Sequence, residues 1–142
     1  MAGPLLALDF IYAPSEDVAR DLDYFERVLG GEVVFAIDGM GARVAMVRLG
    51  DGPPVLLADH LEGTAPVLVY RVEALEAAMG ELEGRGWRRG RMLELPMGAA
   101  CSFVAPGGQR IAIYEASRPF VVESFRGRRD FRGEGEAQSQ RK

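Results

Sequence analysis

The stretch that decides the fold is residues 15–31, which read SEDVARDLDYFERVLGG. Apolar side chains recur within it at Val18, Leu22, Phe25 and Leu29, the spacing of one face of an amphipathic helix. A serine opens the stretch and two glycines close it, and these residue types favour the start and the end of a helix. We therefore predict a helix over residues 15–29.

Runs that are typical of β-strands surround this helix. One run precedes it at residues 5–13, and three follow it at residues 32–37, 43–49 and 55–59. Glycine, proline and aspartate separate the last three runs, as expected of tight turns between strands. The predicted order of elements is βαβββ.

This order occurs a second time. The helix stripe formed by Val18, Leu22 and Phe25 recurs 57 residues later, and Gly52 corresponds to Gly107 at an offset of 55. A repeat of this kind indicates an internal duplication. The second set of predicted elements comprises a strand at 66–72, a helix at 73–84, and strands at 87–95, 99–105 and 109–115. We predict one domain over residues 1–120, with module one at 4–62 and module two at 64–117.

The composition changes after residue 120. Residues 121–142 are rich in Arg, Gly and Glu and have few apolar side chains. Such a segment buries too little apolar surface to offset the entropy of ordering it, so we predict a disordered polar tail. Its mixture of Arg, Gly and Phe is also typical of weak RNA-binding tails. The interspersed acids, among them Asp130, favour a solvated tail instead.

Composition restricts the class of protein. The chain has 142 residues and a net charge of −4, which gives no general attraction to nucleic acid. It contains no apolar run long enough to span a membrane and no basic leader segment. Its single cysteine, Cys101, excludes an internal disulfide and fits a reducing compartment. We therefore predict a cytoplasmic protein that contacts neither membrane nor nucleic acid.

Two motifs carry a resemblance to a known family. They are DYFERVLG at residues 23–30, at the end of the first helix, and FVAPGGQRI at residues 103–111, around the last turn. Together with the repeated βαβββ order, they resemble the vicinal oxygen chelate superfamily, the glyoxalase, bleomycin-resistance and extradiol dioxygenase fold. The resemblance implies an α+β protein whose two tandem modules form a curved, incomplete mixed barrel. The helices lie on the convex side, and the concave cup holds the ligand.

The family's enzymes place four metal ligands in this cup, one on the first and one on the last strand of each module. Here those positions fall near Leu8 to Phe10, on Leu56 or Leu57, near Val67, and on Ala112. Only Asp9 among them can bind a metal, and one carboxylate cannot hold a divalent ion. His60 is the only histidine, and a relocated site built from Asp9, Asp59, His60 and Cys101 is the less favoured alternative. We predict no metal and no cofactor.

The resemblance then implies a metal-free protein that holds an apolar or aromatic small molecule in its cup, as bleomycin-resistance proteins do. The predicted ligand-binding residues are Asp9, Phe10, Phe35, Met46, Leu57, Met92, Phe103 and Tyr114. The face on which each strand residue lies depends on the register, since a shift of one residue inverts a strand. Family members are commonly homodimers, so we predict a homodimer. No catalytic residue is predicted.

Two alternatives remain open. One is a lyase or isomerase of the glyoxalase type, with a relocated or absent metal site and Asp9 as general base. The other is an interaction domain that uses only the fold. Asp9 itself has two interpretations, because it lies in an otherwise apolar strand. Its carboxylate either faces the ligand or hydrogen-bonds a neighbouring group for structural reasons.

Overall fold

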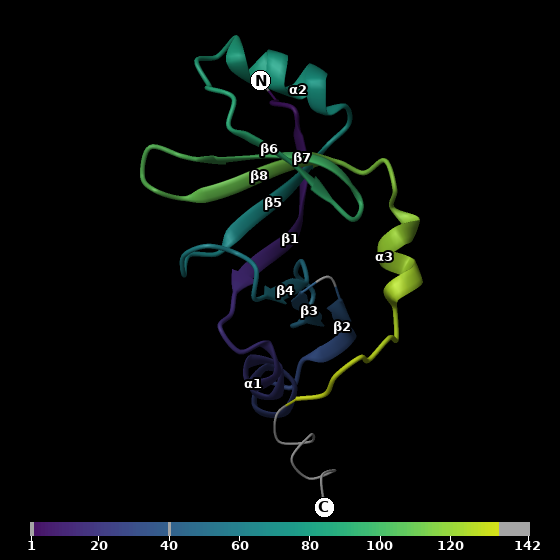
Figure 1. The fold of residues 1–142 in the computed structure, drawn as a ribbon. Coiled ribbons are helices and arrows are strands. Elements are labelled where there is room, and N and C mark those ends of the chain that lie inside the picture. Colours follow the sequence, from purple (N-terminus) through teal and green to yellow (C-terminus); the bar gives the residue numbers. More distant parts are fainter. Residues whose placement is uncertain (1, 40, 134–142) are drawn as a thin grey trace, which may run out of the picture. The chain divides into compact units, whose positions relative to one another are not determined.

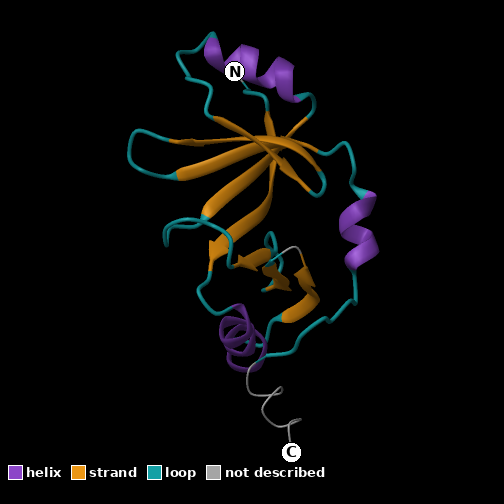
Figure 2. Ribbon diagram, in the orientation of Figure 1, coloured by secondary structure: helices purple, strands orange, loops and turns teal. Residues whose placement is uncertain are grey.

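The computed structural model describes residues 2–39 and 41–133 (Figure 1). Module one contains β1 (Leu5–Pro14), α1 (Val18–Asp23), the π-helical turn η1 (Tyr24–Val28), β2 (Glu32–Gly39), β3 (Ala42–Arg48) and β4 (Val55–Ala58). Module two contains β5 (Val67–Val72), α2 (Leu75–Glu83), β6 (Arg91–Leu95), β7 (Gly98–Val104) and β8 (Arg110–Glu115), and α3 (Phe120–Phe125) follows it. The βαβββ order thus occurs twice, as predicted. Figure 2 distinguishes the helices from the strands.

Both modules pair their strands in the same way. The first strand runs parallel to the last, so that β1 pairs with β4 and β5 pairs with β8, and the other neighbours within each module are antiparallel. The strand order of the mixed, eight-stranded open sheet is β2-β3-β4-β1-β5-β8-β7-β6. The predicted α+β fold class is confirmed. Within the described residues, no helix has the length and hydrophobicity needed to cross a membrane.

The chain forms two compact units that do not coincide with the two modules. Of the described residues, unit 1 contains 2–9 and 67–124, and unit 2 contains 10–39, 41–66 and 125–133. The first half of β1 therefore belongs to the unit of module two, and the C-terminal segment belongs to the unit of module one. Each unit has a hydrophobic core of its own.

In unit 2, α1 packs against one face of β2, β3 and β4. The buried core residues are Val18, Leu22, Ala36, Ala45, Val47 and Leu57. The helix begins at its cap Asp17, whose carboxylate accepts a hydrogen bond from the Arg20 N–H at 3.1 Å. Ser15, which we expected in this role, instead donates to the Asp21 carboxylate. Gly30, with φ +74°, ends the helical segment in the left-handed region as expected.

In unit 1, α2 packs against one face of β8 and β7 (Figure 1). The buried core residues are Val72, Leu75, Ala78, Met79, Cys101 and Ile113. The rings of Trp87 and Phe103 pack edge to face beside them, with centroids 5.3 Å apart. Ala74 precedes α2 and has no side chain that can cap it, so the Glu115 carboxylate accepts the Leu75 N–H at 2.8 Å.

The segment after residue 120 differs from the predicted disordered tail. Residues 120–125 form α3, and residues 127–130 run parallel to β2 at its edge. The Gly127 N–H donates to the Val34 carbonyl at 2.8 Å, the Ala36 N–H donates to the Arg128 carbonyl at 2.8 Å, and the Asp130 N–H donates to the Ala36 carbonyl at 2.7 Å. We call residues 125–131 the C-terminal strap. Residues 134–142 of the predicted tail lie outside the described residues.

Two phenylalanines fix the strap on opposite sides of β2. Phe125 packs edge to face on Phe35, with ring centroids 5.5 Å apart. Phe131 packs against the core beneath α1, and the Arg43 guanidinium lies 4.6 Å from its ring centroid. These two side chains make the apolar contacts of the strap, which the mostly polar composition of the segment did not predict.

Candidate functional site

The strands of each module have one face that packs against a helix and one that does not. Strand pairing identifies the second face, because residues directly opposite each other point to the same side of a sheet. We call it the helix-free face of that unit. Since both helix-packed faces are filled by core side chains, the helix-free faces are the candidate sites.

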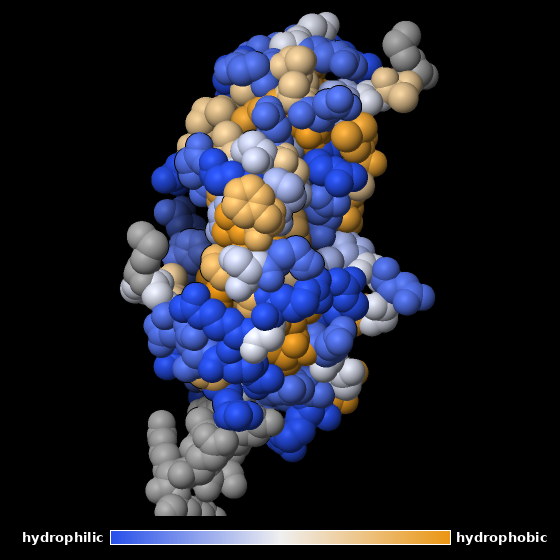
Figure 3. Space-filling model, turned by 90° about the vertical axis from the view of Figure 1, so that its right-hand side faces the viewer, coloured by the Kyte–Doolittle hydropathy of each residue, from blue (hydrophilic) through white to orange (hydrophobic). Residues whose placement is uncertain are grey.

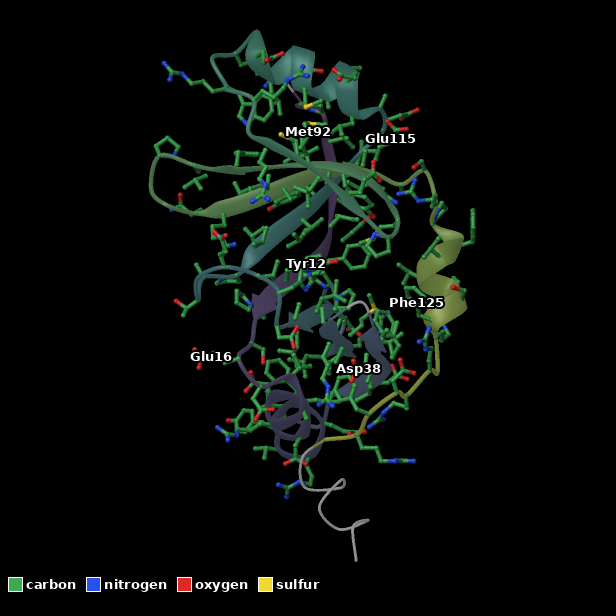
Figure 4. All side chains as sticks on the ribbon, in the orientation of Figure 1. Tyr12, Glu16, Asp38, Met92, Glu115 and Phe125 are labelled. Atoms are coloured by element: carbon green, nitrogen blue, oxygen red, sulfur yellow. The ribbon has the colours of Figure 1, made fainter. Side chains whose placement is uncertain are left out.

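On the helix-free face of unit 2, four large side chains form a row across the strands. Phe35 lies opposite Met46, Met46 opposite Leu56, and Leu56 opposite Tyr12. The exposed fraction of each residue is 9% or less. We call these four residues the apolar row, and Figure 4 labels Tyr12 at one end of it.

Tyr12 is the only member of the apolar row with a polar group. Burial raises the pKa of its phenol to about 12, because the anion would lose its hydration. At neutral pH the hydroxyl is therefore protonated and can donate a hydrogen bond. The apolar row thus combines three buried apolar side chains with one neutral donor.

The helix-free face of unit 1 carries a polar cluster made of Asp9, Arg71 and Tyr114. The Tyr114 hydroxyl donates to Oδ2 of Asp9 at 2.5 Å, and Nε of Arg71 lies 3.7 Å from the same oxygen. Arg71 and Tyr114 are paired neighbours on β5 and β8. Tyr114 is buried, whereas the side chains of Asp9 and Arg71 are 22% and 44% exposed. Solvent therefore reaches the charged ends of the cluster.

This polar cluster can hold a polar group of a ligand. Both contacts of the Asp9 carboxylate use Oδ2, and among the described residues no hydrogen bond reaches Oδ1. Arg71 offers further guanidinium N–H groups. A carboxylate beside a tyrosine hydroxyl can also accept or pass on a proton. The polar cluster therefore has groups that can hydrogen-bond a ligand and groups of the type that transfer protons.

Comparison with known proteins gives matches in structure and none in sequence. No family model and no curated protein sequence matches the chain. Methylmalonyl-CoA epimerase from Mycobacterium tuberculosis is similar to it over 81% of this chain and 91% of the epimerase, with 19% identity and a TM-score of 0.66. A variant of the Streptomyces coelicolor methylmalonyl-CoA epimerase, in complex with 2-nitronate-propionyl-CoA, is similar over 80% and 96%, with 16% identity and a TM-score of 0.63.

The chain has the fold of these epimerases. At these identities the similarity establishes the architecture and says nothing further about activity. Any site must therefore be argued from the residues of this chain.

The structure divides the predicted ligand-binding residues between the two faces. Phe35 and Met46 belong to the apolar row, and Asp9 and Tyr114 belong to the polar cluster. Three others lie on the helix-packed side: Leu57 in the core beneath α1, Phe103 in the core beneath α2, and Met92 opposite Cys101 of that core. Figure 4 shows Met92 on the side of the strands that faces α2. Phe10 lies next to Asp9 in β1 and is half-buried.

A wrong repeat offset accounts for the position of Leu57. The offset of 55, taken from the glycine turns, aligns Leu57 with Ala112. Strand pairing instead aligns Leu56 with Ala112, because Leu56 lies between Met46 and Tyr12 as Ala112 lies between Ser102 and Val69. The offset over the last strands is therefore 56. A change of one residue moves a side chain to the opposite face.

Sequence reasoning missed Tyr12, Leu56 and Arg71. Arg71 interrupts the apolar strand VLVYRV in the same way that Asp9 interrupts β1. A pair of opposite charges, each within an apolar strand, was a usable signal that the two side chains meet. Tyr12 carried no such signal, because a tyrosine near a strand end is common in cores.

The enzymes that the sequence resembles hold a metal ion, and the residues at the four corresponding positions of this chain do not fit one. Leu56 lies in the apolar row, and Val67 and Ala112 have no donor side chain. The one carboxylate, Asp9, is engaged by Tyr114 and Arg71. Across residues 2–39 and 41–133, no three His, Cys, Asp or Glu side chains are placed to bind a metal together.

The alternative of a relocated metal site finds no support in the positions of its members. Asp59 accepts a hydrogen bond from the Arg43 N–H at 3.0 Å, and His60 is exposed. Cys101 is fully buried in the core beneath α2. A buried thiol packed among apolar side chains acts as a small hydrophobe.

Proposed function

We propose that this protein binds a small apolar or aromatic molecule without a metal ion. The observation that carries the proposal is the apolar row of Tyr12, Leu56, Met46 and Phe35. These four large side chains are contiguous on the strand face opposite α1, and each is 9% exposed or less. Ligand sites are mostly apolar, with a few polar groups that fix orientation, and the Tyr12 hydroxyl is such a group.

The polar cluster adds to this proposal a second place where a ligand can be held. Arg71 and Asp9 present charged groups that solvent reaches, and Tyr114 holds the Asp9 carboxylate in position. A ligand with a polar substituent would gain orientation from such anchors. Small, buried neighbours on the same face, Val69, Ala100 and Ala112, supply the apolar surroundings.

A screen by thermal shift tests the proposal. Antibiotics, thiol conjugates and aromatic metabolites would be added to the protein, and binding compounds raise its melting temperature. The chain supplies a matched pair of variants, because Leu56 and Leu57 are adjacent in β4 and both are 2% exposed. Leu56 is a member of the apolar row, whereas Leu57 lies in the core beneath α1.

We expect Leu56→Val and Leu57→Val to lose similar stability, about 1 kcal/mol each. Only Leu56→Val should bind the compound more weakly, by about threefold or more, because only this substitution changes the apolar row. Titration calorimetry measures the affinities. Equal weakening by both variants would contradict the apolar row as the site, and a screen without any binding compound would contradict the proposal itself.

The polar cluster favours a second candidate, a lyase or isomerase with Asp9 as general base. The hydrogen bond from Tyr114 and the nearby Arg71 would orient the carboxylate for proton transfer. The two candidates differ in the effect of Asp9→Asn on a compound that binds. Loss of solvent-deuterium exchange at a C–H group next to a carbonyl, with binding intact, would favour the enzyme. Weaker binding without any exchange in the wild type would favour the binding protein.

We also propose a homodimer. Three apolar side chains at the end of the first helical segment, Tyr24, Val28 and Leu29, are 48–58% exposed, and association would cover them. On the face drawn in Figure 3, polar residues surround separate apolar patches. Light scattering should give about 31 kDa, twice the 15.5 kDa of one chain. A monomer at tens of micromolar would contradict the dimer.

A further inference from the structure

The C-terminal strap reaches the apolar row. Phe35 is the end member of that row, and the Phe125 ring packs edge to face on it at 5.5 Å. Phe35 points to the helix-free face, because its neighbour Ala36 points into the core beneath α1. Phe125 therefore lies on the helix-free face of unit 2. Figure 4 labels Phe125 at the end of α3.

We propose that Phe125 occupies the position of an aromatic ring of the ligand, so that the ligand displaces it from Phe35. This inference rests on the proposed function and specifies the ligand class. An edge-to-face ring pair shows that the geometry at Phe35 accepts an aromatic group. The strap thus acts as a tethered competitor at one end of the apolar row.

The remainder of the strap is anchored independently of Phe125. Main-chain hydrogen bonds join Gly127, Arg128 and Asp130 to β2, and Phe131 packs on the other side of the strand. Asp130 is held by the Asp38 N–H at 2.9 Å and by Arg128 at 2.8 Å. These contacts can persist when the Phe125 ring leaves.

The helix on the N-terminal side of Phe125, α3, is short and has no buried residue. It has six residues, too few to be stable without packing. Gly127 has a φ of +81°, in the left-handed region where a non-glycine residue is disfavoured. It lies inside a turn in which the Arg128 N–H donates to the Phe125 carbonyl at 2.9 Å, so the Phe125 ring leaves by rotation of its side chain while this turn is kept.

The test uses 2-naphthol as an aromatic probe and decahydro-2-naphthol as its saturated counterpart. Binding is followed by the NMR signal of the Met46 methyl group, which lies opposite Phe35 in the apolar row. Phe125→Ala removes the competitor, and Phe125→Leu removes the ring but keeps an apolar side chain. Phe120→Ala is the matched control, because Phe120 is in the same helix and is 69% exposed.

We expect 2-naphthol to bind Phe125→Ala and Phe125→Leu about two- to tenfold more tightly than the wild type, the range that one aromatic pair corresponds to. Phe120→Ala should match the wild type, and the saturated alcohol should bind more weakly throughout. Equal or weaker 2-naphthol binding in both Phe125 variants would overturn the inference, and so would the absence of any Met46 response. The proposed function is judged separately, by whether the screen finds a compound that Leu56→Val binds more weakly. Neither result with 2-naphthol changes the outcome of that screen.

Discussion

The helix-free faces of the two units have the same strand pairing and different side chains. The apolar row of unit 2 corresponds, position by position, to Val69, Ala112, Ser102 and Arg91 in unit 1. Large apolar side chains in one module are thus replaced by small or charged ones in the other. The adjacent row shows the reverse difference, because Arg71 and Tyr114 correspond to Pro14 and Ala58.

This comparison shows which features the two modules share and which they do not. Both keep the helix-packed face apolar, since Leu57 corresponds to Ile113 and Ala45 to Cys101 in the two cores. The helix-free faces carry no such common pattern. Because the helix-packed cores stabilise each module, the helix-free positions are free to differ, and they supply an apolar surface in one unit and polar anchors in the other.

The largest expected effect comes from the strap, which is present on the edge strand of unit 2. Ending the chain at Ser124 removes three main-chain hydrogen bonds, the Phe125–Phe35 pair and the packing of Phe131. We expect a loss of about 4 kcal/mol in the free energy of unfolding, measured in urea. Phe120→Ala, the control, should change it by less than about 0.5 kcal/mol. Unchanged stability of the shortened chain would show that the strap is only loosely attached.

The sequence predicted the elements well because periodicity reports directly on packing against a helix. The stripe of Val18 and Leu22 and its repeat at Leu75 and Met79 all lie in the cores. The face of the sheet on which each strand residue lies was harder to predict, because it depends on the exact register of the strand. The repeat offset was wrong by one residue in the last strands, and β2 has an irregularity between Val33 and Phe35 that alters its alternation.

The strap could not be predicted, because its attachment uses contacts that hydrophobicity does not report. The Gly127 and Asp130 N–H groups bond to β2, and any residue except proline could supply them. The side-chain signal consists of Phe125 and Phe131 in a segment that is otherwise polar. The polar cluster was predicted in part, since Asp9 and Tyr114 were both singled out but their hydrogen bond depends on the pairing of distant strands.

The second prediction concerns the Tyr12 phenol of the apolar row, whose ionisation should lower the stability of the fold in alkaline solution. Its pKa is about 12 in the folded protein and 10.0 ordinarily. A pKa raised by folding means that the contribution to stability is complete below pH 10 and is lost as the pH rises to about 12. Two pKa units correspond to a loss of about 3 kcal/mol. Urea unfolding at a series of pH values measures it, and Tyr12→Phe should remove this part of the pH dependence. The same slope in wild type and variant would show that Tyr12 ionises normally.

The smallest of the three effects concerns the polar cluster of unit 1, where the hydrogen bond from Tyr114 to Asp9 has no counterpart in module one. Tyr114→Phe removes the hydrogen bond to the Asp9 carboxylate. Arg71, at 3.7 Å, then remains as the partner of that carboxylate. We expect a loss of about 1.5 kcal/mol in the free energy of unfolding, because the partly exposed carboxylate can turn to water instead. Tyr70→Phe is the control, since the Tyr70 ring packs against the core beneath α2 on the opposite face. Combining Tyr114→Phe with Asp9→Asn in a double-mutant cycle isolates the bond, and a coupling energy near zero would mean that the two side chains stabilise unit 1 independently.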